Sequence, residues 1–300
     1  MSEAYSHRYL ELGGIRTHYL EAGPPSAGTI VLLHSGEFGA GAELCWERVI
    51  GGLAARHHVI APDWLGFGES DRIYDFGGGA ARRLRHMTLV LDELGVRRSL
   101  FVGNSMGGTA LARVAASHEP RWPMAGIALI SGGGFAPDNE ARRATLAYDG
   151  TPNAMREIMR VLMFDASWAL EDAYIERRVA QSREPGAWEV VSAARFKAPW
   201  IEPRSQFGQP DFTEYEQITV PALVIAGAED RLREPGYAHD LAARIPDSTL
   251  RVYARCGHMA NLEFPDRVVE DLEAFAAGLE LESTCPPDLT GDLMRDPARG

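Results

Sequence analysis

The feature that most limits how this chain can fold is the alternation of short apolar runs with longer segments of helical periodicity. The apolar runs lie at Thr29–Leu33, His58–Ala61, Ser99–Gly103, Gly126–Ile130 and Ala222–Gly227. Helical spacing covers Leu44–Ala55, Ala80–Leu94, Gly107–Ser117, Glu234–Ile245 and Asp266–Gly278. Strands that are apolar along their whole length are buried on both faces, as in a parallel sheet covered by helices. We therefore predict an α/β fold, with a mostly parallel sheet and helices on both faces.

A hairpin and a last strand complete the predicted sheet. Arg8–Leu12 and Arg16–Glu21 alternate between apolar and polar residues on either side of Gly13-Gly14, which is typical of a hairpin. The hairpin is expected to form an antiparallel edge. Thr249–Tyr253 has the composition of a further strand.

One long segment interrupts this rhythm. Residues 135–213 contain no clear buried strand, but helical spacing recurs at Asn139–Leu146, Asn153–Phe164, Leu170–Gln181 and Ala187–Phe196. We predict a helical lid over residues 135–213, inserted into a core made of residues 1–134 and 214–279. Residues 280–300 are polar and rich in proline and glycine, so a disordered tail is expected there.

Charge and cysteine content exclude several classes of protein. The 42 acidic and 30 basic residues give a net charge of −12, which argues against nucleic acid or an anionic membrane as a partner. Cys45, Cys256 and Cys285 form no C-x-x-C pair, so neither a disulfide framework nor a metal site is expected. The N-terminus is polar, and no run approaches the ~20 apolar residues of a membrane span. These features predict a soluble, cytoplasmic protein.

The strongest chemical signal is the sequence Gly103-Asn104-Ser105-Met106-Gly107. This G-x-S-x-G pattern follows a predicted strand directly and precedes a predicted helix. A sharp strand-to-helix turn exposes a nucleophile at the edge of a sheet, and the glycines let the backbone bend without Cβ clashes. The helix that follows directs its N-terminal amides toward an anion forming on the substrate. Ser105 is therefore the candidate nucleophile.

A serine hydroxyl needs a base, and the base needs a carboxylate that fixes its tautomer. His258 follows the last predicted strand and precedes the last helix. Asp230 follows the strand Ala222–Gly227, and the adjacent Glu229 competes for the same role. The order along the chain is nucleophile, acid, base, as in the α/β-hydrolase fold.

Over roughly residues 8–278 the chain resembles the α/β-hydrolases. Within them it resembles the meta-cleavage-product hydrolases, which split carbon–carbon bonds in 2-hydroxy-6-oxo-dienoates formed by aromatic ring fission. Val102–Gly108 matches that family's V-G-N-S-M-G-G, and Cys256-Gly257-His258 matches its C-G-H. Gly227–Arg231 resembles its G-x-D-D-R, which favours Asp230 as the acid. Asp63–Asp71 resembles a superfamily turn that shapes the sheet.

The resemblance also implies roles around the triad. Backbone amides of Gly36 and Met106 would form the oxyanion hole. Substrate contacts would come from Ser35, Asn104, Met259 and Arg177. An arginine of the family's lid helix binds the substrate carboxylate, and Arg178 beside Arg177 leaves the choice between the two open. The sequence departs from the family at Glu37-Phe38, where members carry Gly-Pro, and at Met259, where many carry tryptophan.

The resulting prediction is a cofactor-independent serine hydrolase that acts on a small molecule, most simply a carbon–carbon bond hydrolase. An ester or lactone hydrolase on the same triad is the alternative, because it needs no carboxylate anchor. A ligand-binding protein without catalysis is a third hypothesis, against which the intact triad argues. No metal or nucleotide is implied, and the resemblance allows a homodimer.

Overall fold

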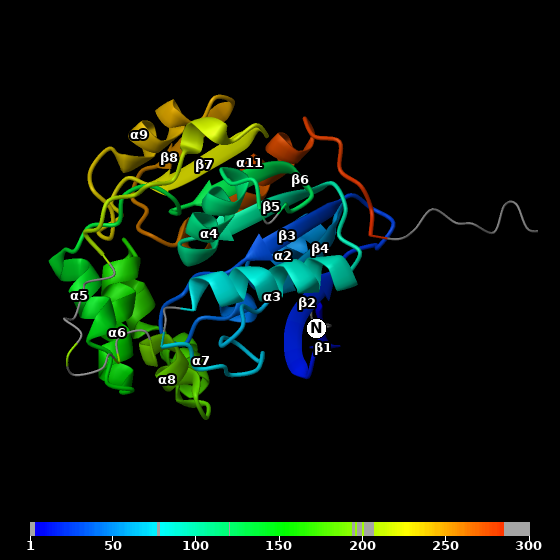
Figure 1. Ribbon diagram of the computed structural model, residues 1–300. Helices are drawn as coiled ribbons and strands as arrows, with labels where there is room; N and C mark the ends of the chain where they lie inside the picture. Colours follow the sequence, from blue (N-terminus) through cyan, green and yellow to red (C-terminus); the bar gives the residue numbers. More distant parts are fainter. Residues whose placement is uncertain are drawn as a thin grey trace, which may run out of the picture.

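The computed structural model describes residues 4–76, 79–119, 121–193, 196, 200 and 207–284. They form an eight-stranded sheet in the order β1-β2-β4-β3-β5-β6-β7-β8 (Figure 1). Pairing is antiparallel between β1 and β2 and between β2 and β4, and parallel elsewhere. The strands are β1 (Ser6–Leu12), β2 (Ile15–Ala22), β3 (Thr29–Leu33), β4 (His58–Pro62), β5 (Ser99–Asn104), β6 (Met124–Ile130), β7 (Ala222–Gly227) and β8 (Ser248–Tyr253). The predicted α/β fold with its antiparallel edge is confirmed.

Helices cover both faces of this sheet, and successive strand residues supply the two cores in turn. In β3, Val31 and Leu33 pack into one core and Ile30 and Leu32 into the other, because side chains alternate across a strand. The first core is covered by α3 (Ala80–Glu93), α4 (Met106–Ala115) and α9 (Tyr237–Arg244). The second is covered by α1 (Ala42–Trp46), α2 (Ile50–Ala54), α10 (Ala260–Glu263) and α11 (Pro265–Ala276).

The prediction of one helix over Leu44–Ala55 is wrong in detail. The chain forms two short helices, α1 and α2, separated by residues 47–49. Gly51 and Gly52 lower the helix propensity of the segment, and the backbone tightens where Val49 N donates to Trp46 O. The short helix α10, directly after His258, was not predicted.

A helical insertion separates β6 from β7. It contains α5 (Glu140–Leu146), α6 (Pro152–Leu162), η1 (Ala166–Leu170), α7 (Asp172–Arg183) and α8 (Ala187–Ser192). These helices gather at the end of the sheet where β5 and β7 finish (Figure 1). Helix α6 buries Met155, Ile158, Met159 and Leu162 against the core, and this i, i+3, i+4, i+7 spacing is that of one helix face.

The predicted boundary of the tail at residue 280 is too early. Residues 280–284 pack against the sheet: Glu282 O accepts a hydrogen bond from Thr29 N, and Glu282 N donates to Arg98 O. Residues 285–300, including Cys285, lie outside the described part of the chain. No helix in the described ranges is both long and apolar enough to cross a membrane.

Candidate active site

Ser105 stands on the turn between β5 and α4. Its backbone has φ 51° and ψ −111°, a left-handed region that non-glycine residues rarely enter. The turn can be this tight because glycines flank it: a Cβ on Gly107 would lie 2.3 Å from Leu33 O, and one on Gly103 would lie 2.5 Å from the backbone N of Gly108. The G-x-S-x-G pattern therefore places helix α4 directly against β3 and β5 and leaves the hydroxyl at the edge of the sheet.

The three predicted triad residues meet at this edge, although they come from separate parts of the chain. The Oγ of Ser105 lies 2.7 Å from Nε2 of His258, and Nδ1 of His258 lies 2.7 Å from Oδ2 of Asp230. Asp230 and His258 follow β7 and β8, the two neighbouring strands at this side of the sheet. A carboxylate on Nδ1 holds the ring proton there, so that Nε2 can accept the serine proton.

The two adjacent carboxylates that competed for the acid role have different contacts. Asp230 faces the histidine, and its Oδ1 also accepts from Leu232 N. Glu229 instead turns to the loop before His258, where its Oε2 accepts from Cys256 N. Burial opposes ionisation of Asp230, but His258, Arg233 and the hydrogen bonds outweigh it, so its pKa lies below the usual aspartate value.

Two backbone amides face the same space as the serine hydroxyl. The N–H groups of Gly36 and Met106 have no hydrogen-bond partner among the described residues, and both residues line the cavity described below. Met106 opens helix α4, where unsatisfied N–H groups and the helix dipole favour an anion. Gly36 must lack a side chain, because a Cβ there would lie 2.5 Å from Sδ of Met106.

Asp63 fixes the loops that carry these groups. It is buried, its Oδ1 accepts from Ala42 N, and its Oδ2 accepts from Glu69 N and contacts Nδ1 of His18 at 2.7 Å. Burial opposes ionisation here as well, yet the contact with His18 and the other hydrogen bonds lower the pKa of this carboxyl. The next residue, Trp64, donates its backbone N–H to Nε2 of His34, which anchors the start of the Gly36 loop.

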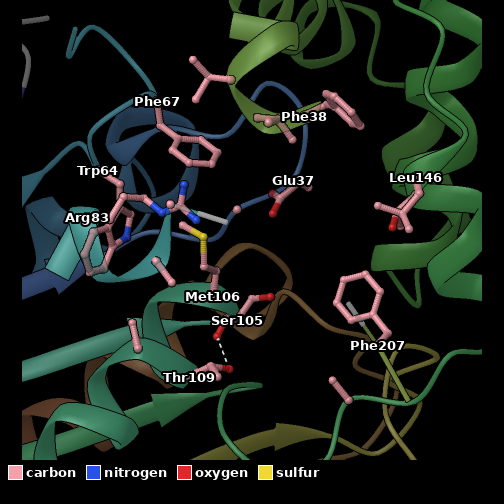
Figure 2. Close-up of a pocket in the computed structure, with 18 of the residues that line it drawn as sticks. Glu37, Phe38, Trp64, Phe67, Arg83, Ser105, Met106, Thr109, Leu146 and Phe207 are labelled. Carbon is pink, nitrogen blue, oxygen red and sulfur yellow. Dashed lines mark hydrogen bonds between the residues drawn. The ribbon is translucent and has the colours of Figure 1, made fainter. Parts of the chain in front are cut away.

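The serine and the histidine open into a cavity of about 450 Å³ between the sheet and the helical insertion (Figure 2). The sheet side contributes Gly36, Ser105, Met106 and His258. Much of the remaining wall is apolar and comes from both parts of the molecule: Phe38, Trp64, Phe67, Leu146, Leu162, Val190, Phe207 and Leu232. A cavity of this size and lining suits a small organic substrate.

The predicted substrate contacts are not found in this cavity. Arg177 lies on the outside of α7, where its guanidinium is 2.8 Å from a carboxylate oxygen of Glu47 and 3.3 Å from one of Glu43. Ser35, Asn104 and Met259 are buried and do not line the cavity. Their contacts are internal; for example, Nδ2 of Asn104 donates to Ile130 O.

Arg178, the neighbour of Arg177, points inward instead. Its guanidinium is 1 % exposed and lies 3.0 Å from Oε1 of Glu37, a residue that lines the cavity. It also donates to Phe38 O. Sequence reasoning missed this pair, although Glu37 carried a signal: a carboxylate in place of the family's Gly-Pro needs a cation when it is buried.

Among the described residues, one group of potential metal ligands lies elsewhere. Ligand atoms of His7, His18 and Glu69 fall within 4.8 Å of one another at the β1–β2 hairpin, outside the cavity. Hydrogen bonds hold the group together: Nδ1 of His7 lies 2.9 Å from Nε2 of His18, and Glu69 accepts from the Tyr9 hydroxyl.

Comparison with known sequences identifies the family. A model of the alpha/beta hydrolase family matches residues 30–271. A 2-hydroxy-6-oxo-6-(2'-aminophenyl)hexa-2,4-dienoic acid hydrolase of Metapseudomonas resinovorans is 30% identical over 266 residues, 88% of this chain and 88% of that protein. A 2-hydroxy-6-oxononadienedioate/2-hydroxy-6-oxononatrienedioate hydrolase of Paraburkholderia phymatum is 30% identical over 280 residues, 89% of this chain and 94% of that protein.

Solved structures agree with the sequence comparison. A serine hydrolase involved in carbazole degradation superposes with a TM-score of 0.76 at 28% identity, covering 91% of this chain and 99% of that one. A meta-cleavage product hydrolase from Pseudomonas fluorescens IP01 gives a TM-score of 0.78 at 25% identity, covering 90% of this chain and 97% of that one. The chain belongs to the alpha/beta hydrolase family and resembles, within it, the hydrolases of 2-hydroxy-6-oxo-dienoates.

Proposed function

We propose that this protein hydrolyses a carbon–carbon bond in a 2-hydroxy-6-oxo-dienoate, with Ser105, His258 and Asp230 as its catalytic triad. The observation that carries the proposal is the continuous contact from Asp230 through His258 to Ser105. The serine opens into the cavity beside two backbone amides that have no partner among the described residues. Relatives that are named for this class of substrate cover most of the chain.

The first step converts the dienol to its keto form, with the proton of the 2-hydroxyl transferred to C5. Ser105, or a water that it orients, then attacks the C6 carbonyl, and its proton moves to Nε2 of His258. The amides of Gly36 and Met106 hold the oxyanion; losing one such donor typically lowers the rate ~100- to 1000-fold.

Cleavage of the C5–C6 bond follows. The electron pair moves onto C5, where it is conjugated with the 2-oxo group, and His258 returns its proton to the departing fragment. If Ser105 is the nucleophile, an acyl-serine remains, and water activated by His258 hydrolyses it to the second acid. Asp230 keeps the ring in the productive tautomer throughout.

The alternative is hydrolysis of an ester or lactone on the same triad. One observation favours it: both arginines that sequence reasoning considered for the substrate carboxylate are already paired, Arg177 with Glu43 and Glu47 outside the cavity and Arg178 with Glu37. An ester substrate needs no such anchor.

A spectrophotometric screen separates the two. Coloured ring-fission dienoates and p-nitrophenyl esters are offered to wild type, to Ser105→Ala and to Ser117→Ala, a control just beyond the C-terminal end of α4. Bleaching of a dienoate by wild type and by Ser117→Ala, and its loss in Ser105→Ala, is the expected result. Rapid ester turnover with every dienoate left intact would overturn carbon–carbon hydrolysis. The homodimer and the cytoplasmic location stay predictions from sequence.

A further inference from the structure

The lining of the candidate active-site cavity is strongly cationic, although the protein as a whole carries a net charge of −12. The only carboxylates among the described residues that line it are Glu37 and Asp75, and each is paired, Glu37 with Arg178 and Asp75 with Arg82. Against them the lining contains five arginines: Arg82, Arg83, Arg113, Arg142 and Arg233. The cavity is therefore built for an anion.

Among the described residues, four of these arginines have no ion pair; Arg113 is exposed, Arg233 is held by backbone carbonyls, and Arg83 and Arg142 are half-buried. Arg83 is the first of the two half-buried ones. It projects from α3, is half-buried, and its guanidinium makes no hydrogen bond or ion pair with any described residue. It lies 5.9 Å from the ring centre of Phe67, and Figure 2 shows it between Phe67 and Met106, facing the cavity. Burial lowers its pKa, and Asp75 opposes this only in part, so a negative ligand would be stabilised there.

Arg142 is the second. Its Nε donates to Pro137 O and its Nη2 to Leu232 O, which fix the side chain, while Nη1 has no partner among the described residues. No described carboxylate lies within ion-pair distance of it. Burial and the nearby Arg233 lower its pKa to about 10. The guanidinium of Arg233 donates hydrogen bonds to the backbone carbonyls of Ser131, Gly133 and Phe135.

These two guanidinium groups lie on opposite sides of the nucleophile. Figure 2 shows Arg83 on one side of Ser105, and Phe207 with Leu146 on the other. The guanidinium of Arg142 lies 4.3 Å from the ring centre of Phe207, which places Arg142 at this second end. A substrate that spans the cavity therefore meets a cation at each end and the serine hydroxyl between them.

We propose that the cavity binds a dianion: a molecule with a carboxylate at each end and its reacting carbonyl at Ser105. Arginine suits this task because its planar fork can take a carboxylate through two hydrogen bonds. This inference rests on the proposed function: the substrate is then a 2-hydroxy-6-oxo-dienoate whose C6 substituent ends in a second carboxylate. A phenyl or alkyl substituent would leave one of these half-buried arginines without an anion.

The proposal of a dianionic ligand can be tested by measuring binding, without any turnover. Calorimetry on the wild-type protein compares nonanedioate with nonanoate, which has the same length and one carboxylate. We expect nonanedioate to bind at least tenfold more tightly, with an advantage that shrinks as salt is raised. Equal binding, tighter binding of nonanoate, or no detectable binding of nonanedioate would each overturn the proposal.

Paired variants assign the two ends. Arg83→Gln and Arg142→Gln should each remove the advantage of nonanedioate. Arg85→Gln, an exposed neighbour on α3, and Arg143→Gln, which pairs with Asp138 on the outside of α5, should preserve it. Melting curves confirm that each variant is folded. If both cavity variants keep the full advantage, these arginines do not bind the two carboxylates.

Turnover then separates this inference from the proposed function. Wild type should cleave a dienoate with a terminal carboxylate on its C6 chain at least tenfold better in kcat/KM than the neutral-chain analogue. Each cavity variant should lower kcat/KM for the diacid tenfold or more, but only one of them should affect the monoacid. If both acids are cleaved equally well, only the proposal of a dianionic substrate is overturned. If neither acid is cleaved, carbon–carbon hydrolysis itself is overturned.

Discussion

Asp230 and Glu229 are adjacent carboxylates, and only Asp230 contacts the candidate base. Asp230→Asn should lower kcat about 10⁴-fold, because an amide in this place favours the wrong histidine tautomer. Glu229→Gln is the matched control: its amide oxygen can still accept from Cys256 N, and kcat should stay within about threefold, far from the loss of a triad member. Steady-state kinetics on one substrate checks both. Equal losses would mean that the assignment of the acid is wrong.

Arg177 and Arg178 offer the same kind of comparison between an exposed and a buried ion pair. Arg178→Met leaves Glu37 charged and unpaired in the interior and should lower the free energy of unfolding by about 3–5 kcal/mol. Arg177→Met removes a half-exposed pair and should lower it by less than about 1 kcal/mol. Urea titration measures both. Arg177→Met should also leave turnover unchanged. A large loss of turnover would mean that Arg177 does act in the active site.

At the scale of elements, the sequence predicts the strands well because each depends on a local pattern, and the three residues of the predicted triad lie in contact in the structure. Ala222–Gly227 is a strand with the predicted bounds, and the elbow lies where G-x-S-x-G placed it. The choice between Arg177 and Arg178 stays open in the sequence because successive helix residues point about 100° apart. A difference of one residue therefore decides whether Arg177 or Arg178 faces inward, and tertiary packing, not periodicity, sets that choice.

The elbow itself makes a prediction about packing between elements. Gly107→Ala would place a methyl group 2.3 Å from Leu33 O and 2.7 Å from His34 O. Both are backbone atoms, so α4 must move away from β3, and we expect the free energy of unfolding to fall by about 1–3 kcal/mol. Gly278→Ala is the control, since the nearest atom lies 3.5 Å away. Thermal unfolding followed by circular dichroism compares them, and an unchanged Gly107→Ala midpoint would contradict the close approach.

At the scale of the whole molecule, the cationic cavity is the property that sequence reasoning could not reach. The two half-buried arginines that have no ion pair with a described residue, Arg83 and Arg142, lie on α3 and α5. These helices belong to the core and to the insertion and are separated along the chain. Nothing in a net charge of −12 indicates that arginines gather around the serine. Only the folded arrangement of both parts reveals it.

The buried carboxylates also give the whole molecule a defined response to acid. Burial acts to raise the pKa values of Glu37, Asp63 and Asp230, but their partners outweigh it, so all three pKa values lie below those of ordinary glutamate and aspartate side chains. A lowered carboxyl pKa gives stability that is complete above the unfolded value and is lost as pH falls through the folded one. The pKa of Glu263 is shifted in the opposite direction, because burial raises it above the ordinary glutamate value.

The free energy of unfolding should therefore fall most steeply below pH 4.5, where the three shifted carboxylates take up protons on unfolding. Urea titrations at a series of pH values measure this slope. Asp63→Asn removes one of the three groups, so it should be less stable than wild type at pH 7 and lose less stability on acidification. Asp247→Asn, at an exposed position, controls for the change in net charge. If the free energy of unfolding of Asp63→Asn falls with pH as steeply as that of wild type, the prediction is wrong. The contacts of this carboxylate with His18 and the loop amides would then not stabilise the site at neutral pH.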